Sequence, residues 1–178
     1  MAHYGRGVED ALHCLTVLAH LPHDAGASAR DLAEYQGISA SMLAKYLPKL
    51  EKAGIIVSVE GARGGYRLAC EATEISLLEV AEAVEGRNAL FECRNIRANC
   101  AVFEGEVPKW ALVGVCSIHA AMLRAEQVMR ESLAGVSLSD VMMEFSSVAP
   151  IEFFEDSSEW FAKRSKEREV GRGWKNKD

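Results

Sequence analysis

The chain has 178 residues, of which 49% are hydrophobic, and a formal net charge of −6 at pH 7. This length and composition allow one domain with a proper hydrophobic core and a smaller appended region. The acidic balance argues against a protein that coats nucleic acid non-specifically, because such binding depends on Lys and Arg side chains that neutralise phosphates. A sequence-specific DNA binder remains open, since its basic groups need to line only one face.

The start of the chain is amphipathic and lacks the unbroken apolar stretch of a signal peptide. No segment approaches the length of about 18–20 apolar residues that crosses a bilayer, so we expect a cytoplasmic protein with no membrane partner. In a reducing cytosol the five cysteines do not predict a disulfide framework. They are either buried small residues or ligands for metal and redox chemistry, and we expect Cys14 and Cys70 to be packing residues.

Two helical patterns open the chain. Apolar residues recur at helical spacing from Val8 to Leu18, with polar residues between them. Ser28 is a suitable N-cap for a second, shorter helix over residues 29–36. Asp31 lies in the first turn of that helix, where a negative charge interacts favourably with the helix dipole.

A third helix begins at Ser39 or Ser41 and ends at Gly54. Three leucines share one of its faces: Leu43, Leu47 and Leu50. Pro48 lies inside this helix, where proline removes a hydrogen bond and kinks the axis. Either the helix bends after Tyr46, or the segment that enters a DNA groove is short.

A β-hairpin follows the third helix. Residues 55–59 are rich in β-branched side chains and predict one strand, and residues 66–69 predict the returning strand. Gly64 and Gly65 allow a backbone path in the turn that side chains would obstruct. Helix, turn, helix and hairpin in this order predict a winged helix-turn-helix, a mainly α fold with a small β-hairpin wing.

The region after the hairpin predicts further helices. Ser76 and Glu79 form a capping box, whereas residues 86–115 show no regular pattern. A long helix then carries a narrow apolar seam, which suits a contact between two helices better than a broad core face. The residues of this seam, which we expect to dimerise, are Ile118, Met122, Ala125 and Met129. Another short helix begins at Ser137, and the pattern is lost after Phe145.

Four regions follow from these patterns. Residues 1–86 form the DNA-binding domain, and residues 87–116 form a sensor loop that contains cysteines. Residues 117–145 contain the dimerisation helix and the short helix after it. Residues 146–178 form a C-terminal tail that we expect to be partly disordered, because its end is highly charged. Four aromatic residues of this tail are candidates for docking elsewhere: Phe153, Phe154, Trp160 and Phe161.

The start of the third helix is the candidate recognition element. Hydroxyl and amine side chains there can reach base edges or phosphates in a major groove about 12 Å wide. The turn of the hairpin can reach phosphates or the minor groove, which Arg63 would enter. The predicted DNA contacts are Ser28, Ser39, Ser41, Met42, Lys45, Tyr46, Lys49, Arg63, Gly64, Gly65 and Tyr66. The alternative is a winged helix used only for protein contacts, with its basic residues as a solvated face.

Residues 28–33, 39–43, 50–56, 61–69 and 75–80 closely resemble the IscR/NsrR-type family of winged-helix regulators. The Gly-Gly-Tyr-Arg-Leu wing in this context is a specific signal. Cys93, Cys100 and the segment from Cys116 to His119 fall where that family places its cluster-binding loop and the start of its dimer helix. The match covers roughly residues 3–135.

The resemblance implies a homodimer on a palindromic site in double-stranded promoter DNA, usually acting as a repressor. In family members with a metal site, three cysteines hold an iron–sulfur cluster, here a [2Fe–2S] cluster in preference to [4Fe–4S]. The fourth ligand would be His119, or an acidic residue of the first helix from the other subunit, for which Glu9 or Asp10 is the nearest equivalent. Many family members have no cluster.

The cysteine spacing departs from the family pattern. Cys93 and Cys100 are separated by six residues, but Cys100 and Cys116 by fifteen, and residues 104–110 look like an insertion. Such a loop does not forbid a cluster, because closure entropy grows slowly with loop length. Cys116 and His119 can face one point from the first turn of a helix, whose N-terminus favours thiolate. Iron–sulfur clusters and zinc both suit these ligands, and a metal-free sensor of thiol oxidation or of a small molecule is the alternative.

These observations predict a sequence-specific transcription regulator. It would respond to a redox, iron–sulfur or nitric-oxide type of signal through Cys93, Cys100 and Cys116. A cysteine- or metal-dependent enzyme is a rival class, but the sequence lacks a glycine-rich phosphate loop, a nucleophile elbow and an evident acid–base pair, so we expect no enzyme. A protein-interaction module is a third class, which the acidic charge and the aromatic tail would suit.

Overall fold

The computed structural model describes residues 3–22, 25–61 and 64–175, with side chains described as far as residue 170. It divides into two compact units. The first unit contains residues 1–86 and 133–178, and the second contains residues 87–132. None of the helices in the described part of the chain is both long and apolar enough to span a membrane.

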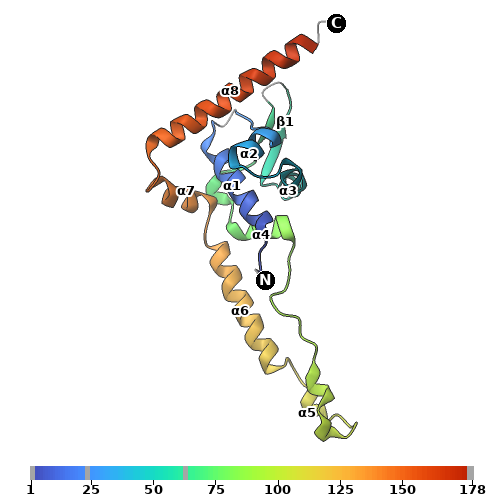
Figure 1. The fold of residues 1–178 in the computed structure, drawn as a ribbon. Helices are drawn as coiled ribbons and strands as arrows, with labels where there is room; N and C mark the ends of the chain where they lie inside the picture. Colours follow the sequence, from blue (N-terminus) through green and yellow to red (C-terminus); the bar gives the residue numbers. More distant parts are fainter. Residues whose placement is uncertain (1–2, 23–24, 62–63, 176–178) are drawn as a thin grey trace. The chain divides into compact units, whose positions relative to one another are not determined.

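The first unit begins with three helices, α1 (Arg6–His20), α2 (Ala29–Gln36) and α3 (Ala40–Lys52) (Figure 1). The Ser28 hydroxyl accepts a hydrogen bond from the backbone N–H of Asp31 at 3.1 Å, as expected of an N-cap. Gly37 ends α2 in the left-handed region with φ 66°, a conformation that glycine adopts at little cost. The predicted bounds of α2 are confirmed, and α3 continues as helix through Pro48.

The wing is an antiparallel hairpin of β1 (Ile56–Val59) and β2 (Gly65–Leu68), paired from Ile56↔Leu68 to Val59↔Gly65. Both glycines that precede Tyr66 are required by close backbone approach. A Cβ atom on Gly64 would lie 2.2 Å from the carbonyl oxygen of Val59, and one on Gly65 would lie 2.4 Å from the backbone of Ala27. The predicted reason for these glycines is therefore confirmed.

Apolar side chains from α1, α2, α3, the hairpin and the later helices form one core. Its largest fully buried side chains include Leu15, Leu32, Leu43, Leu47, Leu50, Ile56, Ile75, Val80, Val84 and Leu138. Cys14 is buried among them, as predicted, and burial together with the nearby charge of Asp10 raises its pKa to about 12. This thiol is a neutral packing group at physiological pH.

Two capped helices complete the body of this unit. A 3₁₀ turn (Ala72–Glu74) precedes α4 (Leu77–Glu85), and α7 (Leu138–Ser146) comes later in the chain. Ser76 with Glu79, and Ser137 with Asp140, form reciprocal capping boxes. An isolated antiparallel bridge joins the two cap serines to each other, so both helices begin at the same place in the fold.

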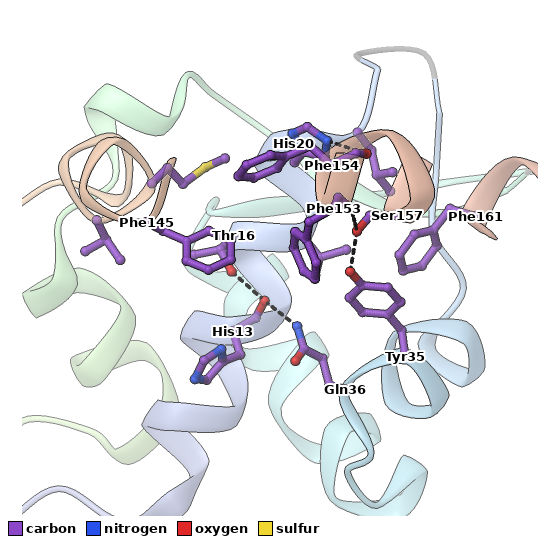
Figure 2. Close-up of a pocket in the computed structure, with 14 residues that line it drawn as sticks. His13, Thr16, His20, Tyr35, Gln36, Phe145, Phe153, Phe154, Ser157 and Phe161 are labelled. Carbon is purple, nitrogen blue, oxygen red and sulfur yellow. Dashed lines mark hydrogen bonds between the residues drawn. The ribbon is translucent and has the colours of Figure 1, made fainter. Parts of the chain in front are cut away.

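The pattern after Phe145 predicted no further helix, but the structure contains α8 (Ile151–Lys175). The aromatic side chains of α8 pack against the rest of the first unit, next to α1, α2 and α7 (Figure 2). The ring of Tyr35 lies 5.4 Å from that of Trp160 and 5.0 Å from that of Phe161. Tertiary contacts of this kind stabilise a helix whose own amphipathic pattern is weak.

The second unit contains two 3₁₀ turns (Ile96–Asn99 and Ala101–Phe103), the single-turn α5 (Lys109–Leu112) and most of α6 (Ser117–Ala134). Hydrogen bonds from the Arg97 side chain stabilise the segment before α6. Arg97 donates to the carbonyl oxygen of Gly114 at 2.7 Å and, through Nε, to the Asn95 side chain at 2.9 Å. Among the apolar residues described in this unit, only Ala111 is buried.

Candidate nucleic-acid interface and cysteine loop

The N-cap and the first two turns of α3 present polar side chains to solvent. Ser39, Ser41, Met42 and Lys45 are all exposed. The hydroxyls of Ser39 and Ser41 lie 2.9 Å apart, and the Lys45 ammonium lies 3.9 Å from the Met42 sulfur. These contacts lie along the surface of the helix itself, so the group is accessible to a ligand outside the protein.

Two residues further along α3 contact other helices of the first unit. Lys49 donates a 2.5 Å hydrogen bond to the carbonyl oxygen of Val84, near the end of α4. The Tyr46 ring covers Gly7 of α1 so closely that a Cβ there would lie 2.8 Å from the ring. Both side chains fix α3 against the helices behind it. This placement depends on tertiary neighbours, which helical spacing alone does not reveal.

The predicted wing residues divide in a similar way. Tyr66 is half-buried and pairs through its backbone with Ala27, the residue before Ser28. The Ser28 side chain caps α2 and also donates to the Asp31 carboxylate at 2.6 Å. Arg63 lies outside the described residues. Sequence reasoning missed Arg30, an exposed cation in the first turn of α2, which its position two residues after the cap could have indicated.

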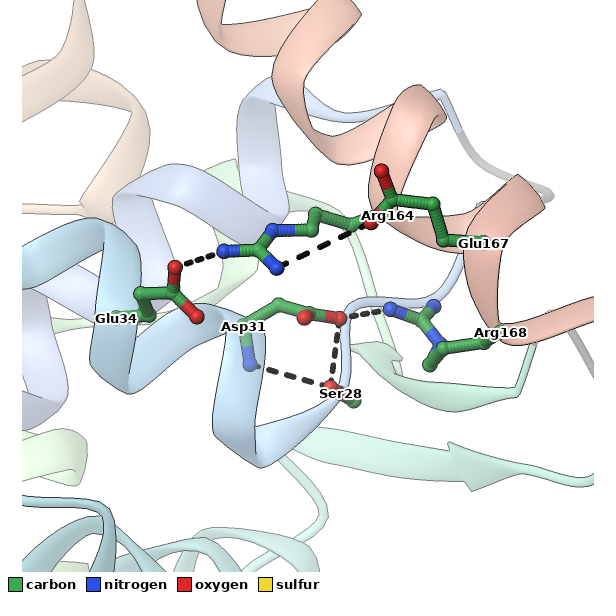
Figure 3. A network of polar contacts seen from close by, with 6 residues as sticks. All are labelled: Ser28, Asp31, Glu34, Arg164, Glu167 and Arg168. Carbon is green, nitrogen blue, oxygen red and sulfur yellow. Dashed lines mark hydrogen bonds and ion pairs between the residues drawn. The ribbon is translucent and has the colours of Figure 1, made fainter. Parts of the chain in front are cut away.

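An ion-pair network joins α8 to α2 (Figure 3). Arg168 pairs with Asp31, whose residue is only 5% exposed, and Arg164 pairs with Glu34. The Arg164 guanidinium also lies 4.9 Å from the centre of the Trp160 ring, a cation–π arrangement. Since Asp31 also holds Ser28, this network ends at the N-terminus of α2.

The cysteines of the second unit occupy three different settings. Cys93 is half-buried, Cys100 is exposed, and Cys116 is half-buried immediately before α6. Hydrogen bonds from the backbone N–H groups of His119 and Ile118, with a smaller effect of the Arg97 charge, lower the pKa of the Cys116 thiol. Cys116 is therefore the thiol of this loop whose pKa the neighbouring backbone lowers.

The described residues do not arrange these donors as a metal site. No group of three or more His, Cys, Asp or Glu side chains within them could hold a metal ion. The His119 ring lies 6.0 Å from the ring of Phe91, while its backbone N–H bonds to Cys116. Thiolates and imidazole suit an iron–sulfur cluster or zinc chemically, but as placed here Cys93, Cys100, Cys116 and His119 do not fit one.

A helix-turn-helix followed by a glycine-dependent hairpin wing is the fold of many DNA-binding transcription regulators. The model of the Rrf2 family, described as an iron-dependent transcriptional regulator, matches residues 4–144. The chain belongs to the Rrf2 family. Its relatives are regulators, so its role is regulatory and not enzymatic.

Individual relatives agree with this assignment. The chain is 34% identical over 119 residues to protein rrf2 of Nitratidesulfovibrio vulgaris, covering 67% of this chain and 73% of that protein. It is 33% identical over 121 residues to the regulator NsrR of Shouchella clausii, covering 68% and 78%. The solved structure of T. potens IscR has the same fold, with a TM-score of 0.61 at 20% identity over 84% of this chain and 93% of that one. The resemblance to IscR and NsrR is thereby confirmed.

Proposed function

We propose that this chain is a homodimeric repressor that binds a palindromic site in double-stranded promoter DNA and responds to a signal at its cysteine loop. The observation that carries the DNA-binding part is the exposed N-terminal part of α3, from its N-cap Ser39 to Lys45, with two hydroxyls and one ammonium group. A segment of this composition can enter the major groove and reach base edges and phosphates.

The proposed DNA contacts fall into two roles. Ser39, Ser41, Met42 and Lys45 meet the duplex directly, and Arg30 of α2 adds a phosphate contact. The residues with partners inside the fold hold these groups in place: Ser28, Tyr46, Lys49, Gly64, Gly65 and Tyr66. Arg63, which follows β1 and precedes β2 in the sequence, is proposed to reach the minor groove.

The proposal of a homodimer is supported by the surface of α6. None of the described side chains of this 18-residue helix is buried in a single chain. Ile118 is 68% exposed and Ala125 is also exposed, while Met122 and Met129 are half-buried. An apolar helix face of this extent is normally covered, and a second copy of α6 would cover it along the seam of Ile118, Met122, Ala125 and Met129.

We propose Cys93, Cys100 and Cys116 as the sensing residues. The lowered pKa of Cys116 supports thiolate chemistry there, and the family description as iron-dependent supports an iron–sulfur form of the signal. The described donors are not gathered into one site. Iron and sulfide analysis of protein purified without oxygen decides between a cluster and a metal-free thiol sensor.

The DNA-binding proposal is tested by fluorescence anisotropy with labelled chromosomal promoter fragments. We expect saturable binding that weakens as salt rises, because phosphate contacts release counterions. Lys45→Ala should weaken binding by roughly 5- to 100-fold, as loss of a charged contact to DNA does. Lys52→Ala is the matched control, since Lys52 is also exposed but lies at the last turn of α3. Equal effects of the two substitutions would contradict the assigned recognition turn.

A further inference from the structure

A cavity of about 240 Å³ lies within the first unit, between α1, the end of α2, α7 and α8 (Figure 2). Five tyrosine and phenylalanine rings line it: Tyr35, Phe145, Phe153, Phe154 and Phe161. The rings of Phe145, Phe153 and Phe154 pack edge to face at 5.5–5.6 Å between centres. Such contacts fix the walls of the cavity in aromatic pairings that are favourable by themselves.

The polar residues of the cavity wall are His13, Thr16, His20, Tyr35, Gln36 and Ser157. Thr16 and Gln36 donate to the carbonyl oxygen of His13, and the His20 Nε2 lies 3.0 Å from the carbonyl oxygen of Phe154. Ser157 is buried and donates its single hydroxyl hydrogen to the carbonyl oxygen of Phe153 at 2.6 Å. The 2.5 Å contact between Ser157 and Tyr35 therefore uses the Tyr35 hydrogen, with Ser157 as acceptor. The Tyr35 oxygen keeps acceptor capacity at the cavity wall, so a ligand that bonds there has to donate.

The side chains that line the cavity also limit the charge of a ligand. None of the described residues that line the cavity is Lys, Arg, Asp or Glu. Apart from the imidazoles of His13 and His20, a carboxylate or ammonium ligand would therefore find no partner that could carry an opposite charge, so the loss of its hydration is costly. An uncharged ligand has no such cost.

We infer that this cavity is a binding site for a small, uncharged aromatic molecule that carries one hydrogen-bond donor. Its size agrees with a bicyclic compound, because an apolar cavity of about 150 Å³ already accepts benzene. The donor of the ligand bonds to the Tyr35 oxygen, and its rings pack among the phenylalanine side chains.

The position of the cavity couples a bound molecule to the DNA-binding face. This extension rests on the proposed function. Tyr35 of α2 and Phe161 of α8 are both walls and pack on each other at 5.0 Å between ring centres. The same two helices are joined by the pairs of Arg164 with Glu34 and of Arg168 with Asp31. An occupant therefore stabilises α8 against α2, the helix that precedes the recognition turn.

Binding is tested by calorimetric titration of the full chain with indole and with indene, two bicyclic probes of similar shape. Indole has an N–H donor and indene has none. We expect indole to bind about fivefold more tightly, the effect of one ordinary hydrogen bond. In Tyr35→Phe the preference should disappear while indene binding persists. A preference that survives Tyr35→Phe, or failure of both probes to bind the native chain, would overturn the inference.

A second pair of variants tests the location. Val141→Phe fills the cavity from α7 and should weaken indole binding at least tenfold. Val148→Phe is the matched control, because Val148 is 79% exposed and lies outside the cavity. Circular dichroism of both variants verifies that they fold. Indole binding to folded Val141→Phe with native affinity would also overturn the inference.

The probe titrations need no DNA, so they fail or succeed independently of the proposed function. Promoter affinity measured with and without saturating indole then tests the coupling, and we expect a change of about five- to tenfold, a typical allosteric effect. Unchanged promoter affinity with bound indole removes the coupling but leaves the site. Loss of DNA binding in every condition contradicts the regulator and leaves the ligand site standing.

Discussion

The two units of this chain bury their apolar residues to very different extents. In the first unit Leu15, Leu43 and Leu50 are fully buried, and α1 packs against α3, α4 and the hairpin. In the second unit Trp110 is 73% exposed and Ile118 68%, with Ala111 as the buried apolar residue among those described. The first unit therefore contains the interactions that make it stable by itself. The second has an apolar surface that a further chain is expected to cover.

The largest expected loss of stability comes from a substitution in the core of the first unit. Leu43→Ala removes a fully buried side chain and should lower the free energy of unfolding by about 2–5 kcal/mol. Leu123→Ala on α6 is the matched control, since Leu123 is 45% exposed, and should lower it by less than about 1 kcal/mol once dimer formation is accounted for. Chemical denaturation of both variants measures the difference. Equal losses would show that the second unit contains a core of its own.

Substitutions of glycine test the same difference between the two units at the level of the backbone. Gly65→Ala should destabilise the first unit by about 2–3 kcal/mol, because the new Cβ meets the Ala27 backbone and φ is +152°. Gly105→Ala in the second unit should cost about 1 kcal/mol, since φ is +94° but nothing lies within 4 Å. Thermal unfolding followed by circular dichroism measures both. A smaller effect at Gly65 than at Gly105 would contradict the hairpin packing.

The ion pairs of α8 should contribute less than the core. Arg168→Gln leaves the buried Asp31 carboxylate with its cap contacts only and should destabilise the chain by about 1–3 kcal/mol. Lys166→Gln, at an exposed position on the same helix, should have almost no effect. Hydrogen exchange of α8 amides is the direct readout. Unchanged protection in Arg168→Gln would show that the aromatic contacts alone hold this helix.

The thiols should have the smallest effect on stability, but they should differ clearly in reactivity. Cys116 has a lowered pKa, so its thiolate form and its alkylation persist as the pH falls below the ordinary thiol pKa. Cys14 is buried with a pKa of about 12 and should stay unmodified until the chain unfolds. Peptide mapping after iodoacetamide treatment at several pH values checks this. Faster labelling of Cys14 than of Cys116 would contradict the two environments.

Local signals in the sequence were sufficient for most of the first unit. The Ser28 cap, the Gly37 stop and the capping box of Ser76 with Glu79 act within one helical turn, so they can be read without knowing the fold. The glycines of the wing were equally readable. Each of these signals predicted an element that the structure contains.

The features that sequence reasoning missed depend on distant partners. The inward stripe of α8 contains Ser157, Arg164 and Arg168, which look like solvent-facing residues until Tyr35, Glu34 and Asp31 are placed opposite them. The engagement of Lys49 with the end of α4 is similarly invisible in the α3 pattern. The cysteine spacing gave the ligand types but not their arrangement, because loop geometry is set by contacts such as those of Arg97.

The mass of the complex between the chain and a promoter duplex of about three helical turns tests the central claim most directly. Two recognition turns on adjacent turns of DNA require two chains for each duplex. Sedimentation velocity should therefore give a complex with two chains for the native protein. Met122→Glu, which places a charge in the proposed α6 seam, should shift the free protein to single chains. A complex with one chain for each duplex, or native protein that forms none, would contradict the account.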